Sequence, residues 1–532
     1  TTTTSAATTT AVKTTTAATT TAATTAATTT TAAAATTAAA GAHPVQGSVT
    51  RIMNQGVTTM FPPEEGPNDF YTTNYMLEPL FVMNITGAYE GLVAESWKID
   101  QTAKTFTLNI RKNVKFHDGT ICDAAAVAFN LQLAKDAKVQ YYTYISSMDT
   151  PDANTVVCHL SSMDITTITM MSSMGMISPT AYKAAGATED ARKAWARVNP
   201  VGTGPYKFVE FKRDSYVKMT RNDNYWQAGK PYIKNLTIQI IPDIMVSSAL
   251  LQSGDADCWW SNANITTSAI DLEKKGFGVN WWTGGISEFI LFNSADKTKP
   301  WSDPNVRAAF EYAMNRPEMA NLIGSGKYIP LTQVCQPGSM CDTGYDPHPY
   351  NIQKAKDLLK AAGYPNGFKT TLITIQRDAT IAAAVQGYLK AVGIDCTLDM
   401  SDTARYYNQI WTTTGWSDLA LVSMPLSQNN SEIIWQMGSR PLNFKAACFY
   451  KSQTLLDLSE KALTYPSYEA AKDTMKAMLK EYSDQTLCVA LYQAPYSLIY
   501  NNIKGMGYHT NFLTSVDGSY WRLYDDWTDK TK

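Results

Sequence analysis

The chain has 532 residues, with 45 Lys and Arg against 47 Asp and Glu and a formal net charge of −2. This length exceeds what one hydrophobic core supports, so we expect two or more lobes. A near-neutral charge without a Lys/Arg block argues against nucleic-acid binding. The sequence also lacks an apolar run of about 18 residues, the length needed to span a membrane.

Residues 1–40 are almost wholly Thr and Ala, with a single Lys13. The β-branched Thr residues lower the helix preference of the tract, and no amphipathic face is present to dock on a core. We therefore predict a disordered tether over residues 1–43, of the kind that forms the stalk of a surface lipoprotein. A disordered terminus without that role is the alternative.

The pattern of residues 89–160 predicts a small group of strands with one helix. Apolar and polar residues alternate from Lys104 to Ile110, as in a half-buried strand. Asp123 is placed to cap the following helix, and a strand is expected from Thr155 to Leu160. His117 lies beside Asp118 in a tight turn, but no nucleophile is close in the sequence, so we interpret His117 as structural.

We expect the stretch from Leu250 to Asn293 to lie at the centre of the molecule. Gly254 is suited to end a helix in the left-handed conformation, and a strand should begin near Asp257. Neighbouring side chains of a strand point to opposite faces, so one indole of Trp259-Trp260 and one of Trp281-Trp282 should face outward, toward a cleft. The apolar run from Phe289 to Phe292 is typical of a strand covered on both faces.

Strands and helices alternate after residue 300. Asp303 as cap and Pro304 at the first helical position begin one helix, and a second helix ends at Gly363. A strand over 370–374, a helix from about 380 and a strand over 394–400 should follow. This alternation predicts a mixed or parallel sheet.

The eight cysteines form no CxxC pair and the five histidines are scattered, so we predict no metal site. Pro337-Gly338 can turn the chain between Cys335 and Cys341, which favours a disulfide there. In the alternative, all eight cysteines are buried free thiols. We expect Cys258 and Cys396 to be free thiols in strands.

Two glycine-rich segments might suggest a nucleotide site, but neither has the required pattern. The segment 199–206 leads into a Pro and a strand, and Gly324–Lys327 lacks the upstream glycine of a phosphate-binding loop. We therefore predict no cofactor.

Seven sequence blocks carry a family resemblance, in the family's order, between about residues 47 and 510. They are YEGLVAESW, FTLNIRKNVKFHDGT, VGTGPYKFVEF, NDNYW, LLQSGDAD, SDPNVRAAFEYAMNRPEM and YNIQKAKDLLKAAGYPNGF. The chain thereby resembles the family 5 extracellular solute-binding proteins, which are dipeptide-, oligopeptide- and nickel-binding components of ABC importers. The resemblance implies an α/β, two-lobed periplasmic-binding-protein fold (class II-like, cluster C type) with a small extra domain on the first lobe.

The resemblance also implies a domain division and a set of partners. Lobe I should comprise 44–81, 201–290 and 495–532, the extra domain 82–200 and lobe II 291–494. The implied partners are a small or oligomeric solute and the permease subunits of an ABC importer, with no nucleic acid. A lipid anchor upstream of the tether would hold a monomer outside the cytoplasm, at the cell surface or in the periplasm.

One departure from the family bears on the ligand. Peptide binders of the family resemble one another in an acidic residue that pairs with the peptide's ammonium group, and that position falls at or near Ser427. The window 425–431 contains no Asp or Glu. A buried ammonium without a charge partner costs several kcal/mol, so a free α-amine requires Glu432 or another carboxylate.

Indole faces and neighbouring polar side chains define the ligand site that we predict between the lobes. It comprises Trp259, Trp260, Asn262, Trp281, Trp282, Trp411, Trp416, Ser427, Gln428, Asn429 and Trp435. The ligand is predicted to be an oligopeptide or a peptide-like solute, with an oligosaccharide or aromatic solute as the alternative. A hydrolase is less favoured because neither paired carboxylates nor a G-x-S-x-G motif is found, and a surface adhesion module is the remaining alternative.

Overall fold

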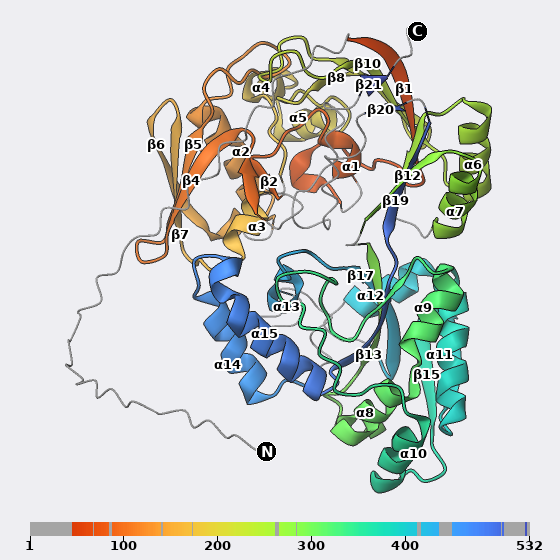
Figure 1. The fold of residues 1–532 in the computed structure, drawn as a ribbon. Helices are drawn as coiled ribbons and strands as arrows, with labels where there is room; N and C mark the ends of the chain where they lie inside the picture. Colours follow the sequence, from red (N-terminus) through yellow and green to blue (C-terminus); the bar gives the residue numbers. More distant parts are fainter. Residues whose placement is uncertain are drawn as a thin grey trace, which may run out of the picture.

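The computed structural model describes residues 45–66, 69–83, 88–139, 142–172, 174–260, 265–282, 285–411, 416–435, 450–501, 503–504 and 527–528. These residues form two lobes that are joined by neighbouring strand crossings (Figure 1). A four-stranded sheet with its own helices lies at one side of the first lobe.

The first lobe is built on a seven-stranded sheet with the order β12-β19-β11-β1-β10-β9-β8. Its strands are β1 (Gln46–Met53), β8 (Tyr206–Lys212), β9 (Tyr216–Arg221), β10 (Ile233–Ile240), β11 (Cys258–Trp260), β12 (Gly278–Trp282) and β19 (Tyr496–Tyr500). Strand β19 comes from the end of the chain and pairs with both β11 and β12. The sheet is therefore completed by residues that follow the entire second lobe in the sequence.

Apolar residues cover both faces of this sheet. One face packs under α6 (Ile244–Ser253) and α7 (Thr266–Lys274), and the other packs against η1 (Pro62–Glu64) and α1 (Phe70–Thr73). The Asp243 side chain caps the start of α6, and Gly254 ends the helix with φ at 82°, as the sequence predicts.

The four-stranded sheet has the order β4-β5-β7-β6 and its own apolar core. Its strands are β4 (Ala94–Asp100), β5 (Thr105–Ile110), β6 (Ile145–Asp152) and β7 (Thr155–Leu160), with the β2 (Phe81–Met83) and β3 (Tyr89–Gly91) pair nearby. The associated helices are α2 (Ala124–Asp136), η2 (Tyr142–Tyr144), α3 (Thr167–Met171), α4 (Pro179–Ala184) and α5 (Glu189–Ala196). Asp123 caps α2 as predicted.

His117 joins this region to the first lobe. Its Nδ1 accepts a hydrogen bond from the Gly202 backbone N–H, so Nε2 carries the ring proton and donates to the Gly204 carbonyl at 3.0 Å. Burial lowers the pKa of His117 to about 4, so the ring is neutral at pH 7. The structural interpretation of this histidine is confirmed.

The second lobe contains a six-stranded sheet with the order β14-β18-β13-β17-β15-β16. Its strands are β13 (Ile286–Phe292), β14 (Ile329–Pro330), β15 (Lys369–Ile375), β16 (Asp395–Ser401), β17 (Leu419–Pro425) and β18 (Cys488–Gln493). Side chains from Phe289 to Phe292 alternate between two apolar clusters on opposite faces. The prediction that this run is covered on both sides is confirmed.

Helices cover the two faces of this sheet. On one face lie α8 (Pro304–Ala313), α9 (Arg316–Gly324), α10 (Ile352–Ala361) and α11 (Ala379–Ala391), preceded by η3 (Pro300–Ser302) and η4 (Gln376–Asp378). On the other lie α12 (Thr403–Trp411), α13 (Ser431–Trp435), α14 (Gln453–Leu463) and α15 (Tyr468–Asp484). The Asp303 side chain accepts a hydrogen bond from the Asn305 backbone N–H, with Pro304 at the first helical position, as predicted.

The chain crosses between the lobes twice at one place. One crossing connects β12 to β13 and the other connects β18 to β19, with the Ala494 N–H donating to the Ile286 carbonyl at 2.8 Å. A Cβ atom on Gly285 would lie 1.9 Å from the Ala494 carbonyl oxygen, so this close approach requires glycine. Because β13 already belongs to the second sheet, the first crossing precedes Ile286, earlier than the boundary after residue 290 that the sequence suggested.

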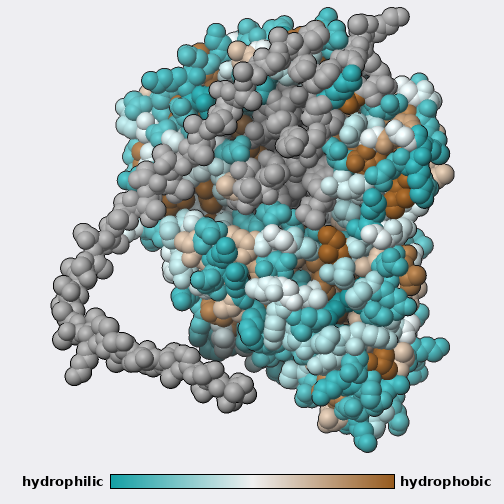
Figure 2. Space-filling view, in the orientation of Figure 1, coloured by the Kyte–Doolittle hydropathy of each residue, from teal (hydrophilic) through white to brown (hydrophobic). Residues whose placement is uncertain are grey.

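On the face shown in Figure 2, the described residues present a mostly hydrophilic surface with small apolar patches. Met245 and Val246 on α6 are 76% and 47% exposed. Among the helices that the structure describes, we find none with the length and apolar character to cross a membrane. The two-stranded pair β20 (Ile503–Lys504) and β21 (Trp527–Thr528) completes the described elements.

The predicted disulfide between Cys335 and Cys341 is wrong, because both are free thiols. The turn between them is held by the carboxylate of Asp342, which accepts hydrogen bonds from the backbone N–H groups of Gly338 and Gly344 at 2.8 and 2.9 Å. Both cysteines instead pack in the apolar core of the second lobe. Cys258 in β11 and Cys396 in β16 are free thiols, as predicted.

Candidate functional site

Three polar side chains of the second lobe meet at the edge of its sheet beside the crossings. Arg377 lies in η4, two residues after the end of β15. Ser423 lies near the end of β17, which runs parallel to β15. Glu288 lies near the start of the antiparallel strand β13, directly opposite Ser423. The carboxyl ends of parallel strands are where ligands commonly bind in open α/β sheets.

A hydrogen-bonded chain links these groups. Arg377 donates through Nε and Nη2 to the two carboxylate oxygens of Asp378, at 2.7 and 2.9 Å. Nη2 also donates to Ser423 Oγ at 2.6 Å, and Ser423 Oγ donates to Glu288 Oε1 at 2.7 Å. The polar network therefore runs from the acid of η4 to the acid of β13.

Two atoms of this network have unused hydrogen-bonding capacity. Arg377 Nη1 makes no hydrogen bond to any residue that the structure describes, and the Arg377 side chain is 41% exposed. Glu288 is only 5% exposed, and its Oε2 has no hydrogen-bond partner within the same part of the chain. Burial and the neighbouring Asp378 raise the pKa of Glu288 to about 8, against the opposing effects of Arg377 and Ser423. The Glu288 carboxyl is therefore mostly protonated at pH 7.

The first lobe presents an aromatic cluster on its side of the crossings. The Trp260 ring lies 4.3 Å from the ring of Tyr71 and 5.9 Å from that of Tyr496, between centroids. Arg51 lies over the Trp260 ring at 5.6 Å and donates to the hydroxyl of Tyr75. Tyr496 is two residues beyond Ala494, so the aromatic cluster and the charged network lie on either side of the same two chain crossings. We call this pair of crossings the hinge.

The first tryptophan pair lies on opposite faces of its sheet, as predicted, but neither indole is exposed. Trp259 is 0% exposed beneath α6 and α7, and its Nε1 donates to Asn54 Oδ1 at 2.8 Å. Trp260 is 1% exposed in the aromatic cluster. The expectation that one indole faces outward is therefore wrong, because the sheet is covered on both sides. Ligand contact by either residue stays a prediction, and the satisfied, core-packed Trp259 is the weaker candidate.

The other described site candidates lie in three environments. Trp416 is 3% exposed in the core of the second lobe. Trp281 is partly buried on β12, where Nε1 donates to Glu273 Oε1 at 3.1 Å. Ser427 and Asn429 are buried and hydrogen-bonded to each other at 2.9 Å, with the half-buried Gln428 between them. Asn429 also lies 3.2 Å from Met83 Sδ of the first lobe, so this segment is at the interface between the lobes.

The remaining candidates fall outside the described part of the structure. Asn262 lies in an undescribed segment, and the same holds for the side chains of Trp282, Trp411 and Trp435. Their ligand contacts stay predictions.

Sequence reasoning missed Glu288 and Arg377. These residues are far apart in the chain and meet only because β13, β17 and β15 are neighbours in the sheet. One signal was available: Glu288 immediately precedes the apolar run from Phe289 to Phe292, and an acidic residue at the start of a strand covered on both faces is costly to bury.

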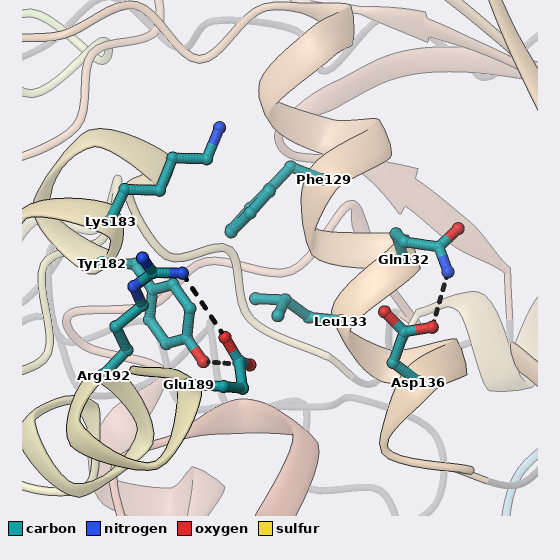
Figure 3. Close-up of a pocket in the computed structure, with 8 residues that line it drawn as sticks. All are labelled: Phe129, Gln132, Leu133, Asp136, Tyr182, Lys183, Glu189 and Arg192. Atoms are coloured by element: carbon teal, nitrogen blue, oxygen red, sulfur yellow. Dashed lines mark hydrogen bonds and ion pairs between the residues drawn. The ribbon is translucent and has the colours of Figure 1, made fainter. Parts of the chain in front are cut away.

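A shallow cavity of about 200 Å³ lies elsewhere, between α2 and the pair α4 and α5 (Figure 3). Its charged side chains already have partners: Tyr182 donates to Glu189 at 2.7 Å, and Arg192 lies 3.8 Å from the same carboxylate. Lys183 lies over the ring of Phe129. This cavity is remote from the hinge and offers no unsatisfied charge, so we do not assign the ligand to it. The described residues contain no group of three His, Cys, Asp or Glu side chains arranged to hold a metal ion.

The family pattern named "Bacterial extracellular solute-binding proteins, family 5 Middle" matches residues 88–431, well over half of the chain. The chain belongs to family 5 of the bacterial extracellular solute-binding proteins. It is therefore a solute-binding component of an ABC transporter, with a small solute and permease subunits as partners and a place outside the cytoplasm.

Individual family members show the extent of the similarity. The glutathione-binding protein GsiB of Escherichia coli (strain K12) is 29% identical over an alignment of 413 residues, and the match covers 72% of this chain and 76% of GsiB. The GsiB protein of Salmonella paratyphi A is 27% identical over an alignment of 420 residues, and the match covers 74% of this chain and 78% of that protein.

Solved structures confirm the predicted two-lobed fold of periplasmic binding proteins. NikA of Brucella suis in complex with Fe(III)-EDTA superposes with a TM-score of 0.78 at 20% identity, covering 91% of this chain and 100% of NikA. DppA of Helicobacter pylori in complex with the peptide STSA has a TM-score of 0.72 at 22% identity, covering 91% of this chain and 98% of DppA. At these identities the likeness concerns the fold alone.

Proposed function

We propose that this protein captures a peptide-like solute with a carboxylate group between its two lobes and delivers it to the permease. The observation that carries the proposal is Arg377, whose guanidinium is held at the hinge edge of the second sheet by Asp378 and Ser423. Its Nη1 has no hydrogen-bond partner among the described residues. A guanidinium fixed in this way is a suitable partner for a carboxylate. The names of GsiB, which binds glutathione, and of the peptide-bound DppA support the same ligand class.

The test is to equilibrate the purified protein with a mixture of amino acids, dipeptides, tripeptides and glutathione, and to identify the retained compounds by mass spectrometry. We expect retained compounds to carry a free carboxylate, and Arg377→Gln to weaken their binding at least tenfold. Arg197→Gln is the matched control, because Arg197 forms a similar two-bond pair with Glu64 in the first lobe, and its side chain is 45% exposed against 41% for Arg377. Retention of C-terminally amidated peptides as strongly as free ones would exclude Arg377 as the anchor.

We further propose that the protein is a monomer and has no catalytic turnover. A lipid anchor upstream of the Thr/Ala tract attaches it to the membrane, and its domain boundaries follow the seven-, four- and six-stranded sheets. The family relatives, which are transport proteins, support the absence of turnover. Chromatographic analysis of a retained peptide after prolonged incubation tests this, since a hydrolase would release fragments.

The alternative ligand, an oligosaccharide or aromatic solute, is favoured by the aromatic cluster around Trp260. Its rings and the nearby Arg51 offer stacking surfaces to an uncharged ring. Retention of such solutes from a glycan mixture, undiminished in Arg377→Gln, would support this alternative.

A further inference from the structure

The charges around Glu288 are unbalanced if this carboxyl ionises. Arg377 supplies one positive charge, and its two-bond pairing with Asp378 already offsets the charge of that acid. The ionisable groups that influence Glu288 from the neighbouring elements include the phenols of Tyr406 on α12 and Tyr492 on β18, whose pKa values lie well above neutral pH because both are buried. An ionised Glu288 therefore needs one further positive charge.

The position of the carboxyl is suited to receive that charge from a ligand. Glu288 Oε1 is fixed by Ser423, whereas the buried Oε2 has no partner among the residues that the structure covers. Tyr492 is the cross-strand neighbour of Glu288, and its ring lies 4.7 Å from that of Tyr328. A carboxylate next to tyrosine rings suits an ammonium group, which pairs with the acid and contacts the ring faces.

We propose that Glu288 binds a cationic group of the ligand, in place of the acidic residue that is missing from the 425–431 window. This inference rests on the proposed function, because it assigns a second charge to the same solute. Arg377 Nη2 and Glu288 Oε1 are separated by only two hydrogen bonds through Ser423 Oγ. The ligand's cation and carboxylate must therefore be close together, as in the zwitterion of an α-amino acid or a short peptide.

Ligand binding is coupled to the loss of one proton from Glu288. The neutral Glu288 carboxyl releases its proton to solvent, and the carboxylate so formed pairs with the ligand's ammonium group. The buried Glu288 carboxylate is then paired with the ligand's ammonium group, and Arg377 is shared between Asp378 and the ligand's carboxylate. The single negative charge that remains lies at the partly exposed side of Arg377, where water can solvate it.

The experiment compares two probe mixtures on the wild-type protein and on Glu288→Gln. One mixture contains amino acids, dipeptides, tripeptides and glutathione with free amino groups, and the other contains the same compounds acetylated on nitrogen. We expect wild type to retain only members of the first mixture, with proton release measured from the buffer dependence of the binding heat at pH 7. Glu288→Gln should lose at least tenfold in affinity and should release no proton.

A matched control variant and the comparison of the two mixtures on wild type complete the experiment. Asp395→Asn removes an acid from the opposite end of the same sheet, where the side chain is 71% exposed, and should bind as wild type does. Equal retention of acetylated and free compounds by wild type overturns the inference, even if the Gln variant fails to fold, and leaves the capture function intact. Unchanged affinity in a folded Gln variant also overturns it. Retention of neither mixture contradicts the peptide-like ligand and the cation site together.

Discussion

The hydroxyl of Thr169 in the first lobe lies 3.0 Å from the phenol oxygen of Tyr468 in the second lobe, and both residues are buried. Two further hydrogen bonds join the lobes nearby. The Leu463 carbonyl accepts from the Ile165 N–H at 3.3 Å, and the Tyr465 carbonyl accepts from the Gln101 side chain at 2.8 Å. The Ile165 side chain belongs to the apolar core of the second lobe. These contacts lie on the opposite side of the molecule from the crossings (Figure 1), so they must break when the lobes separate.

The first prediction is that Tyr468→Phe favours the open arrangement. The hydroxyl pair should contribute about 0.5–1.5 kcal/mol to closure, so affinity for a retained peptide should fall roughly two- to tenfold, mainly through faster dissociation. Small-angle scattering should show a larger radius of gyration. Tyr465→Phe is the control, because the hydroxyl of Tyr465 bonds Thr474 within the second lobe. Equal effects of the two substitutions would count against a role in closure.

The second prediction separates the two neighbouring tryptophans. Trp259→Ala should cost about 3–5 kcal/mol of unfolding free energy, because it empties a fully buried site, and should leave affinity unchanged if the protein folds. Trp260→Ala should weaken binding by about 1–3 kcal/mol through lost stacking and apolar contact. Urea unfolding and calorimetric titration measure the two effects. Unchanged affinity in both stable variants would remove the pair from the site.

The third prediction concerns pH. The pKa of His117 is about 4 in the folded protein because of burial, against about 6.5 for an exposed histidine, so the unfolded state binds more protons between these values. Its contribution to stability is complete above pH 6.5 and is lost as pH falls to 4, by about 3 kcal/mol. Unfolding free energies of wild type and His117→Gln from pH 4 to 7 should therefore differ in slope. Parallel curves would show that this ring does not couple folding to protonation.

The fourth prediction is that Cys335 and Cys341 both react with iodoacetamide once the protein is unfolded without reductant. Alkylation of the folded protein should be slow, because both thiols are buried and burial raises the pKa of Cys341 to about 12. Peptide mapping reports the modified sites. Recovery of a disulfide-linked peptide from the unreduced sample would contradict the structure.

The fifth prediction concerns residues 1–43, which lie outside the described residues. The tract carries almost no apolar side chain that can join a core, so removing it should leave the melting temperature and the affinity unchanged. Differential scanning calorimetry checks this, and a loss of many degrees would show that the tract packs on the body.

Local sequence signals predicted the elements of the fold well, because caps and alternation act over a few residues. Gly254 ends α6, Asp123 and Asp303 cap their helices, and Phe289 to Phe292 is covered on both faces. The turn before Cys341 was misread, since it is held by the carboxylate of Asp342, the residue directly after Cys341, and not by a disulfide. A side-chain capping group and a covalent bridge leave similar turn residues in the sequence.

The candidate site was predicted less well, for a topological reason. Tryptophans can be recognised as candidate ligand contacts from the sequence alone. The pairing of Glu288 with Ser423 and Arg377, in contrast, depends on which strands become neighbours. Strand order is a long-range property that hydrophobic periodicity does not encode. An acidic residue next to an apolar run was the one local sign of this site.

The place of β19 between β11 and β12 has a consequence for biosynthesis. Residues 496–500 leave the ribosome only after all six strands of the second lobe, so until then the first sheet consists of the lone strand β12 and a separate five-stranded piece. The lobe that contains the beginning of the chain is therefore the last to be finished. A nascent chain that stalls after β11 is made but before residue 496 exposes the unpaired edge of β11, a hydrogen-bonding surface open to aggregation or to a chaperone.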